Sequence, residues 1–137
     1  MTTAIDTNIP SALWSAQPIA RVVAAALGRA LGEGRVMACG AVYAELLAYP
    51  KATPEFVDTF FRSTGIAAEF DLGGEIWREA GRRFAAYAQR RRRSGGGESK
   101  RLLVDFVVGA HALLRADRLY TLDPSRYRRD FPELKML

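Results

Sequence analysis

Four acidic side chains stand in apolar stretches of the sequence, where a charged group is costly to bury. They are Asp6 after Ala4-Ile5, Glu45 within residues 42–47, Asp105 within residues 102–108, and Asp123 at the end of residues 119–123. A carboxylate held near a core must find a partner or lose its charge. Few cations lie near these four in the sequence. A bound divalent cation is therefore the simplest way to keep several of them ionised in one place.

The chemistry open to these carboxylates is the binding of a hard cation. Mg²⁺ and Mn²⁺ prefer oxygen ligands, and Mg²⁺ commonly keeps several waters. One or two such ions can orient a water, lower its pKa and stabilise the charge that grows on a phosphate. The pattern therefore favours a metal-dependent nuclease, with Mg²⁺ or Mn²⁺ held by residues Asp6, Glu45, Asp105 and Asp123.

Other catalytic chemistries lack their residues. His111 and Cys39 are the only histidine and the only cysteine, so a pair of histidines that exchange acid and base roles is excluded. The Cys and His pattern of a zinc site is absent as well. The order of residues 95–100 is not that of a phosphate-binding P-loop. We expect Cys39 to be a buried thiol in a reducing compartment, and His111 to be a core or interface residue rather than a catalytic one.

Each acid also has a purely structural explanation. Asp6 could cap the first helix, and Glu45 could lie on a solvated helix face. Asp105 could interact with the dipole at a helix start, and Asp123 could belong only to a turn. If the acids share one site without metal, each close pair would repel by about 4 kcal/mol at ~4 Å and an effective dielectric near 20. Such a site would therefore take up either a cation or a proton.

Hydrophobic periodicity predicts strands that alternate with helices. Strands are expected at residues 2–5, 35–38, 66–70 and 118–122, with a short edge strand at 135–137 as a further possibility. Helices are expected after Thr7, at residues 19–31, 41–49, 54–64 and 73–93, and, after a flexible glycine-rich connection at 94–99, as a buried helix at 102–114. This order predicts an α/β fold, a three-layer sandwich with a central, mainly parallel sheet of four or five strands. Ligand sites in such sheets lie at the carboxyl ends of the strands, so the topology can bring all four acids to one edge.

Length and charge set further limits. The 137 residues suit one domain over residues 1–137. No leader segment and no apolar run near ~20 residues is visible, so a cytoplasmic protein without membrane contact is expected. The net charge is +5, and RNA or partner contacts are expected from a cluster made of Arg90, Arg91, Arg92, Arg93 and Arg101. The alternative is a solvated helix end, since cations suit a helix C-terminus.

The motifs, taken in order, resemble those of the PIN-domain ribonucleases, and most closely those of the VapC-type toxins. The matching segments span nearly the whole chain: Asp6-Thr7-Asn8, Ala44-Glu45-Leu46, residues 105–113, and Leu119-Tyr120-Thr121-Leu122-Asp123 followed by Tyr127 and Phe131-Pro132. The resemblance implies a PIN-like fold and Mg²⁺- or Mn²⁺-dependent cleavage of an RNA substrate. It also implies a homodimer and inhibition by a small cognate antitoxin protein.

Several alternatives stay open from the sequence. Thr7, Asn8 and Thr121 flank the acids and could orient water or substrate, or serve only as caps and turns. A non-catalytic RNA-binding adaptor with the same fold is possible, although the presence of all four acids argues against it. A phosphate-receiving signalling domain also gathers acids at strand ends. That class requires paired acids after the first strand, where Asp6 stands alone.

Overall fold

The chain alternates strands and helices, as its periodicity predicted. The computed structural model describes residues 1–97 and 100–137, so residues 98 and 99 of the expected flexible connection lie outside the described residues. The strands are β1 (Thr2–Ile5), β2 (Arg35–Cys39), β3 (Ala67–Glu69) and β4 (Arg118–Tyr120). The helices are α1 (Asn8–Trp14), α2 (Ile19–Glu33), α3 (Gly40–Leu46), α4 (Pro54–Thr64), α5 (Gly73–Arg93), α6 (Leu103–Arg115) and α7 (Ser125–Arg128).

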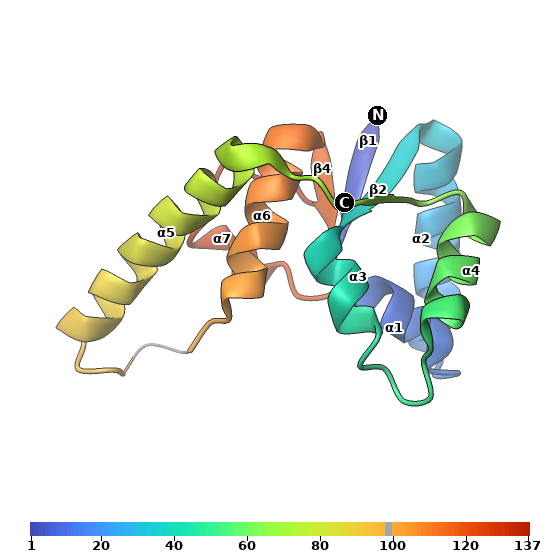
Figure 1. The fold of residues 1–137 in the computed structure, drawn as a ribbon, viewed down its shortest axis with the longest axis horizontal. Coiled ribbons are helices and arrows are strands. Elements are labelled where there is room, and N and C mark those ends of the chain that lie inside the picture. Colours follow the sequence, from blue (N-terminus) through green and yellow to red (C-terminus); the bar gives the residue numbers. More distant parts are fainter. Residues whose placement is uncertain (98–99) are drawn as a thin grey trace.

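The strands form one sheet in the order β3-β2-β1-β4, and each neighbouring pair is parallel. Beyond β4, Met136 pairs with Leu119 in a single parallel bridge, so the expected edge strand at 135–137 is reduced to that contact. Helices cover both faces, with α5 and α6 on one side of the central strands and α2 and α4 on the other (Figure 1). The prediction of a three-layer α/β fold with a parallel sheet is confirmed.

The strand order places a ligand crevice next to β1. From β1 the chain proceeds to β2 on one side, and its last strand, β4, returns to the other side. Open parallel sheets bind ligands at the carboxyl ends of the strands where the order reverses in this way. Asp6 directly follows β1 and therefore stands at this point.

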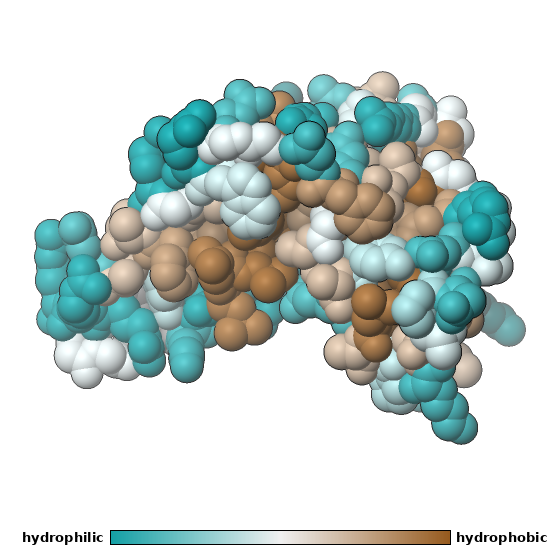
Figure 2. All heavy atoms as spheres, in the orientation of Figure 1, coloured by the Kyte–Doolittle hydropathy of each residue, from teal (hydrophilic) through white to brown (hydrophobic). Residues whose placement is uncertain are grey.

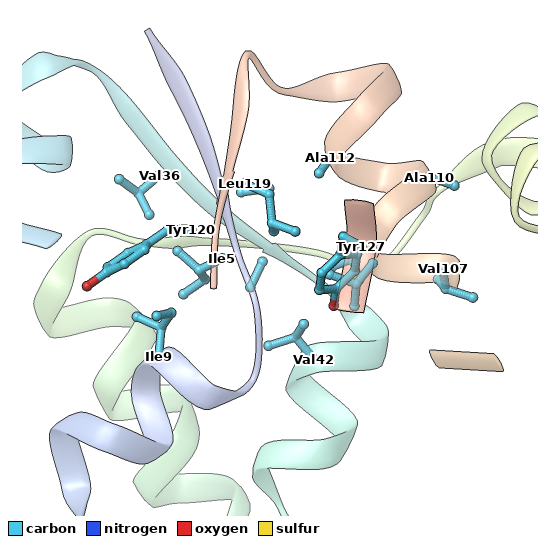
Figure 3. Close-up of a cluster of buried hydrophobic side chains, with 14 of the residues drawn as sticks. Ile5, Ile9, Val36, Val42, Val107, Ala110, Ala112, Leu119, Tyr120 and Tyr127 are labelled. Atoms are coloured by element: carbon cyan, nitrogen blue, oxygen red, sulfur yellow. The ribbon is translucent and has the colours of Figure 1, made fainter. Parts of the chain in front are cut away.

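The core fills the space between the sheet and the helices, and Figure 3 shows Ile5, Val42 and Tyr127 within one buried cluster. The middle of α6 contributes Phe106 and the residues that follow it to this core. The prediction that residues 102–114 are buried along their whole length is wrong at both ends. Leu103 is 51% exposed and Leu114 is 44% exposed, because only the middle turns of α6 are packed between the sheet and α5.

Two local predictions near the C-terminus also differ from the structure. The fourth strand ends at Tyr120 instead of residue 122, since the Thr121 hydroxyl accepts a hydrogen bond from the Asp123 amide at 3.1 Å and turns the chain. No helical periodicity follows Asp123 in the sequence, but α7 begins at Ser125, whose hydroxyl donates to Asp123 Oδ1 at 2.8 Å. Within the described ranges, no helix is both long and apolar enough to cross a bilayer.

Gly109, in the middle of α6, is expected not to tolerate a side chain. A Cβ at this position would lie 2.4 Å from Cε2 of the buried Phe131 ring, so the Gly109→Ala substitution forces the ring to move. We expect a loss of about 1–3 kcal/mol in the free energy of unfolding, measured by urea denaturation. Gly81→Ala on α5 is the matched control, because its Cβ would meet nothing within 4 Å. Equal stabilities of the two variants would contradict the packing argument.

Candidate functional site

Asp6 is the most constrained acid of the site. It is 8% exposed, and its Oδ1 accepts a hydrogen bond from the Thr7 amide at 2.8 Å. Its Oδ2 accepts from the hydroxyls of Thr121 at 2.9 Å and Tyr127 at 2.8 Å. These donors fix the carboxylate in orientation. A carboxylate has about four lone-pair sites, so Asp6 can still accept a further ligand.

Tyr127 supports Asp6, although in the sequence it is recognisable only as part of the closing motif. Its ring is buried, and its pKa is raised by burial and by the charge and hydrogen bond of Asp6. The phenol therefore stays protonated and donates to the carboxylate. The available signal was a tyrosine four residues after Asp123, but nothing in the sequence indicated that it reaches Asp6.

Thr7 links Glu45 to Asp6 through hydrogen bonds. The Thr7 hydroxyl donates to Glu45 Oε1 at 2.6 Å, while the Thr7 amide contacts Asp6. The strand β2 leads directly into α3, so Glu45 lies on the second turn of a helix that starts at the sheet edge. Glu45 is partly buried, which does not fit a fully solvated helix face.

Asn8 and Thr121 join the ends of β1 and β4. The Asn8 side-chain amide donates to the Thr121 hydroxyl at 3.2 Å, and Asn8 Oδ1 accepts from the Leu122 amide at 3.1 Å. Thr121 in turn contacts Asp6. The three residues that the sequence placed beside the acids thus form hydrogen bonds at this edge, and a capping role for Asp6 is not seen, because the N-cap of α1 is Thr7.

Asp105 lies in the first turn of α6, and its Oδ2 accepts from the Leu102 amide at 3.3 Å. Asp105 therefore also has the structural role expected of an acid at the start of a helix. Burial raises the pKa of Asp105, and the nearby Arg126 guanidinium opposes that effect only in part. Asp105 is thus a carboxylate that is costly to keep ionised, and additional positive charge near it would favour its charged form.

Three of the four predicted acids line one cavity of about 270 Å³. Its lining consists of Asp6, Thr7, Asn8, Ser11, Glu45, Leu102, Asp105 and Arg126. Asp123 lines a neighbouring cavity of about 220 Å³. The lining of that second cavity consists of Lys100, Arg101, Asp123, Ser125 and Arg126. The topology therefore brings Asp6, Glu45 and Asp105 together, and it places Asp123 beside them.

Arg126 overturns the expectation that few cations lie near the acids. Its Nη1 is 3.5 Å from Asp105 Oδ1, and its Nε is 3.5 Å from Asp123 Oδ2. The arginine lies on α7, the short helix that the hydrophobic periodicity does not predict. Its position three residues after Asp123 was visible, but the proximity to Asp105 depends on the tertiary fold.

The donor set of the carboxylate cavity fits a hard divalent ion that keeps part of its water. The lining offers carboxylate, hydroxyl and amide oxygens, which are the ligands that Mg²⁺ and Mn²⁺ prefer. In residues 1–97 and 100–137, no three His, Cys, Asp or Glu side chains lie close enough to bind a bare ion directly. Mg²⁺ commonly uses one or two protein carboxylates and several waters, so it does not need three carboxylates in direct contact.

The basic cluster is divided between two environments. Arg90 forms an ion pair with Asp130 at 2.5 Å, which ties α5 to the C-terminal segment. A separate cavity of about 480 Å³ lies next to the end of α5, and its lining includes Phe84, Tyr87, Arg91, Arg92, Lys100 and Arg101. None of Arg90 to Arg93 belongs to the lining of the carboxylate cavity, whereas Arg101 reaches the cavity of Asp123.

His111 is bound within the core. It is 1% exposed, its Nε2 is 2.8 Å from Glu69 Oε2, and it does not line the carboxylate cavity. Burial lowers the pKa of His111, and the hydrogen bond to Glu69 only partly offsets this effect. Burial also opposes ionisation of Glu69, but His111, Arg35 and Arg115 together lower the pKa of that carboxyl. The expectation of a core histidine agrees with these contacts.

Acidification is expected to destabilise the protein through this pair. Below pH 6.5, the ordinary His pKa, His111 is protonated in the unfolded chain. In the folded protein it stays neutral until the pH reaches its own lower pKa, so proton uptake favours the unfolded state. The stabilisation from Glu69 is present above its ordinary value of 4.5 and is lost as the pH falls through its lowered pKa. We expect the free energy of unfolding to fall between pH 7 and pH 5, measured by urea denaturation. Because His111 is the only histidine, His111→Gln should flatten the upper part of that slope. An unchanged slope would contradict this assignment.

Comparison with known proteins adds two kinds of finding. The sequence profile of the PIN domain matches residues 3–132. The structure of VapBC-1 from nontypeable Haemophilus influenzae has a TM-score of 0.68 and 20% identity, covering 100% of this chain and 97% of that one. The structure of VapBC2 from Rickettsia felis, bound to a DNA fragment from its promoter, has a TM-score of 0.70 and 18% identity, covering 100% and 98%. A comparison with curated protein sequences gave no match. At these identities the two structures establish a shared fold.

Proposed function

We propose that this chain, which belongs to the PIN-domain family, is a Mg²⁺- or Mn²⁺-dependent endoribonuclease. The observation that carries the proposal is the convergence of Asp6, Glu45 and Asp105 on one cavity at the carboxyl edge of the sheet. These residues come from three separate parts of the chain. No packing requirement of a core demands three carboxylates there, whereas a cation site does.

The residues of this chain divide the work of such a site. Asp6, Glu45 and Asp105 would hold the ion and its waters, and Asp123 would act from the adjacent cavity. The ion, when bound, supplies an activated water and neutralises charge on the phosphate. Tyr127, Thr121 and Thr7 keep Asp6 and Glu45 in fixed orientations through hydrogen bonds. Such fixed orientation lowers the reorganisation needed when the phosphodiester is attacked.

Cleavage of single-stranded RNA by the purified full chain is the direct test. We expect cutting with Mn²⁺ or Mg²⁺, none with excess chelator, and recovery when the ion is restored. A DNA strand of the same sequence in a parallel reaction tests the preference for RNA. Binding of RNA without any cutting in either ion would contradict the nuclease proposal and would favour the non-catalytic adaptor.

The same proposal includes a toxin role with a cognate antitoxin as partner. The two structures with a similar fold are of proteins named VapBC. Exposed apolar side chains lie beside the carboxylate cavity, where Leu102 is 55% exposed and Leu103 is 51% exposed. Figure 2 shows hydrophobic side chains gathered at the start of α6 and around α3, while the outer part of α5 is hydrophilic. An amphipathic partner segment could bury this apolar surface and cover the cavity.

Expression in a bacterial host tests the toxin role. We expect growth arrest, and relief when a small protein encoded next to this chain is co-expressed. An acidic partner segment would be attracted by Arg91, Arg92 and Arg101, so reversing the charges of Arg91 and Arg92 should slow association at low salt. Unimpaired growth at high expression of folded protein would contradict the toxin role. The cytoplasmic location and the single-domain organisation expected from the sequence stay predictions.

A homodimer is also part of the proposal. Phe70 and Trp77 are 63% and 54% exposed, so both offer large apolar surfaces that a second copy of the chain would bury. Sedimentation equilibrium should give about twice the 15.1 kDa mass of the chain. The Trp77→Glu variant should shift the equilibrium toward the monomer, and a wild-type chain that stays monomeric at high concentration would contradict the proposal.

A further inference from the structure

We propose that Arg126 has two successive partners: it neutralises Asp105 and Asp123 in the metal-free protein, and it binds a phosphate of the RNA backbone beside the carboxylate cavity once metal is present. The inference rests on the proposed function and deepens it, because it names the residue through which metal binding and RNA binding affect each other.

Arg126 lies between two cavities. Arg126 belongs to the lining of both the carboxylate cavity and the cavity of Asp123. Its side chain is 46% exposed, so it is accessible from solvent. A group placed at this boundary can contact a substrate that enters either cavity.

The ion pairs of Arg126 are loose. The distances to Asp105 and Asp123 are both 3.5 Å, longer than the 2.7–3.2 Å typical of N–H···O hydrogen bonds. Among the described residues, the guanidinium donates no hydrogen bond, although it carries five N–H groups. Arg126 therefore compensates charge without being fixed in place, and its donors remain available to a planar anion such as phosphate.

Arg126 and a metal ion would compete for Asp105. The Asp105 side chain is only 13% exposed, and Arg126 Nη1 lies 3.5 Å from its Oδ1, so the guanidinium provides the positive charge beside this carboxylate. A divalent ion in the cavity provides more positive charge than the guanidinium, and the two cations repel each other. Metal binding should therefore weaken the hold of Asp105 on Arg126, and Arg126 should in turn lower the affinity for metal.

The cavity of Asp123 is lined mainly by positively charged side chains. Its lining combines Lys100, Arg101 and Arg126 with a single carboxylate, Asp123, and the Ser125 hydroxyl. Arg101 is held there, since its Nη1 donates to the backbone carbonyl of Arg126 and its own amide donates to the Tyr87 hydroxyl at 2.7 Å. Three cations around a cavity of about 220 Å³ suit the phosphate that neighbours the one being cut.

The test compares wild type with Arg126→Gln, Arg126→Lys and Arg128→Gln. Arg128 is the matched control, because it is exposed on the same helix and belongs to the lining of neither cavity. Two quantities are measured for each protein. One is the Mn²⁺ dissociation constant without RNA, from calorimetry. The other is the pair of kinetic constants, KM and kcat, for cleavage of an RNA oligonucleotide at saturating Mn²⁺ and several salt concentrations.

We expect Arg126→Gln to act in opposite directions on the two ligands. Mn²⁺ should bind at least about threefold more tightly, because a repelling cation is gone. KM for RNA should rise roughly tenfold, the loss expected for a charged hydrogen-bonded contact, and the log–log salt slope should fall by about 0.7. Arg126→Lys should bind Mn²⁺ like wild type but keep a raised KM, because it retains charge without the planar fork. Arg128→Gln should change neither the Mn²⁺ affinity nor KM beyond about twofold.

Results other than these would contradict either the role of Arg126 or the proposed function. If wild type cuts RNA and Arg126→Gln matches Arg128→Gln in both measurements, the inference is wrong and the proposed function stands. If both ligands bind more weakly to Arg126→Gln, the residue has a general structural role. If Arg126→Gln does not fold, Arg126→Lys decides, and a wild-type KM in that variant overturns the phosphate contact. If wild type cuts no RNA, the proposed function fails, and the inference fails with it.

Discussion

Asp105→Asn is expected to reduce metal-dependent RNA cleavage at least about a hundredfold, and Asp6→Asn should have a comparable effect. A metal ion contributes several kcal/mol of charge stabilisation to phosphoryl transfer, and each 1.36 kcal/mol corresponds to tenfold in rate. Both substitutions preserve shape and remove the negative charge that would hold the ion. The loss should appear in initial rates of RNA cleavage at a fixed Mn²⁺ concentration.

The fold should survive both substitutions, which separates a chemical effect from unfolding. In Asp105→Asn, the amide oxygen can still accept from the Leu102 amide, as Asp105 Oδ2 does at 3.3 Å. In Asp6→Asn, the amide oxygen can still accept from the Thr7 amide, and the Tyr127 hydroxyl can rotate to accept from the new amide nitrogen. Asp71→Asn is the matched control, because Asp71 is exposed and remote from the carboxylate cavity. Wild-type cleavage rates in both Asp6→Asn and Asp105→Asn would refute the assignment of the site.

The second large effect concerns stability in the presence of metal. A ligand that binds only the folded state adds about 2.7 kcal/mol to the free energy of unfolding at 100 times its dissociation constant. For a chain of this length we expect millimolar Mg²⁺ or Mn²⁺ to raise the melting temperature of wild type by roughly 10 °C. Asp105→Asn should respond much less, because it lacks one of the carboxylates that face the cavity.

Differential scanning calorimetry with and without the ion measures this effect directly. Asp71→Asn should keep the full shift, which controls for weak binding of cations to surface acids. The metal-free proteins provide a second comparison. Burial raises the pKa of Asp105, so its ionised form costs stability at neutral pH, and Asp105→Asn should be as stable as wild type or more stable. Equal metal-induced shifts in wild type and Asp105→Asn would mean that the ion binds elsewhere.

Local patterns along the chain are enough to predict the layers of this protein. Apolar residues that recur at helical or strand spacing are a local property of the chain, so the strands at residues 2–5 and 35–39 and the long helices could be predicted from their neighbours alone. The alternation of these elements then limits the fold to a parallel sheet with helices on both faces. The four acids were recognisable from local sequence as well, because a charged residue inside an apolar run conflicts with its neighbours.

Which groups meet at the sheet edge depends on contacts between distant parts of the chain. Thr7 contacts Glu45 across 38 positions, and Tyr127 contacts Asp6 across 121 positions, and no periodicity links residues so far apart. The helix α7 has four residues, too few for a periodic signal, and its place is set by the burial of Tyr127. That burial positions Arg126 between Asp105 and Asp123 and leaves Asp123 on a cavity of its own. Side-chain pairing of this kind follows from packing in three dimensions. The candidate acids could therefore be identified from the sequence, but the position of Arg126 beside them could not.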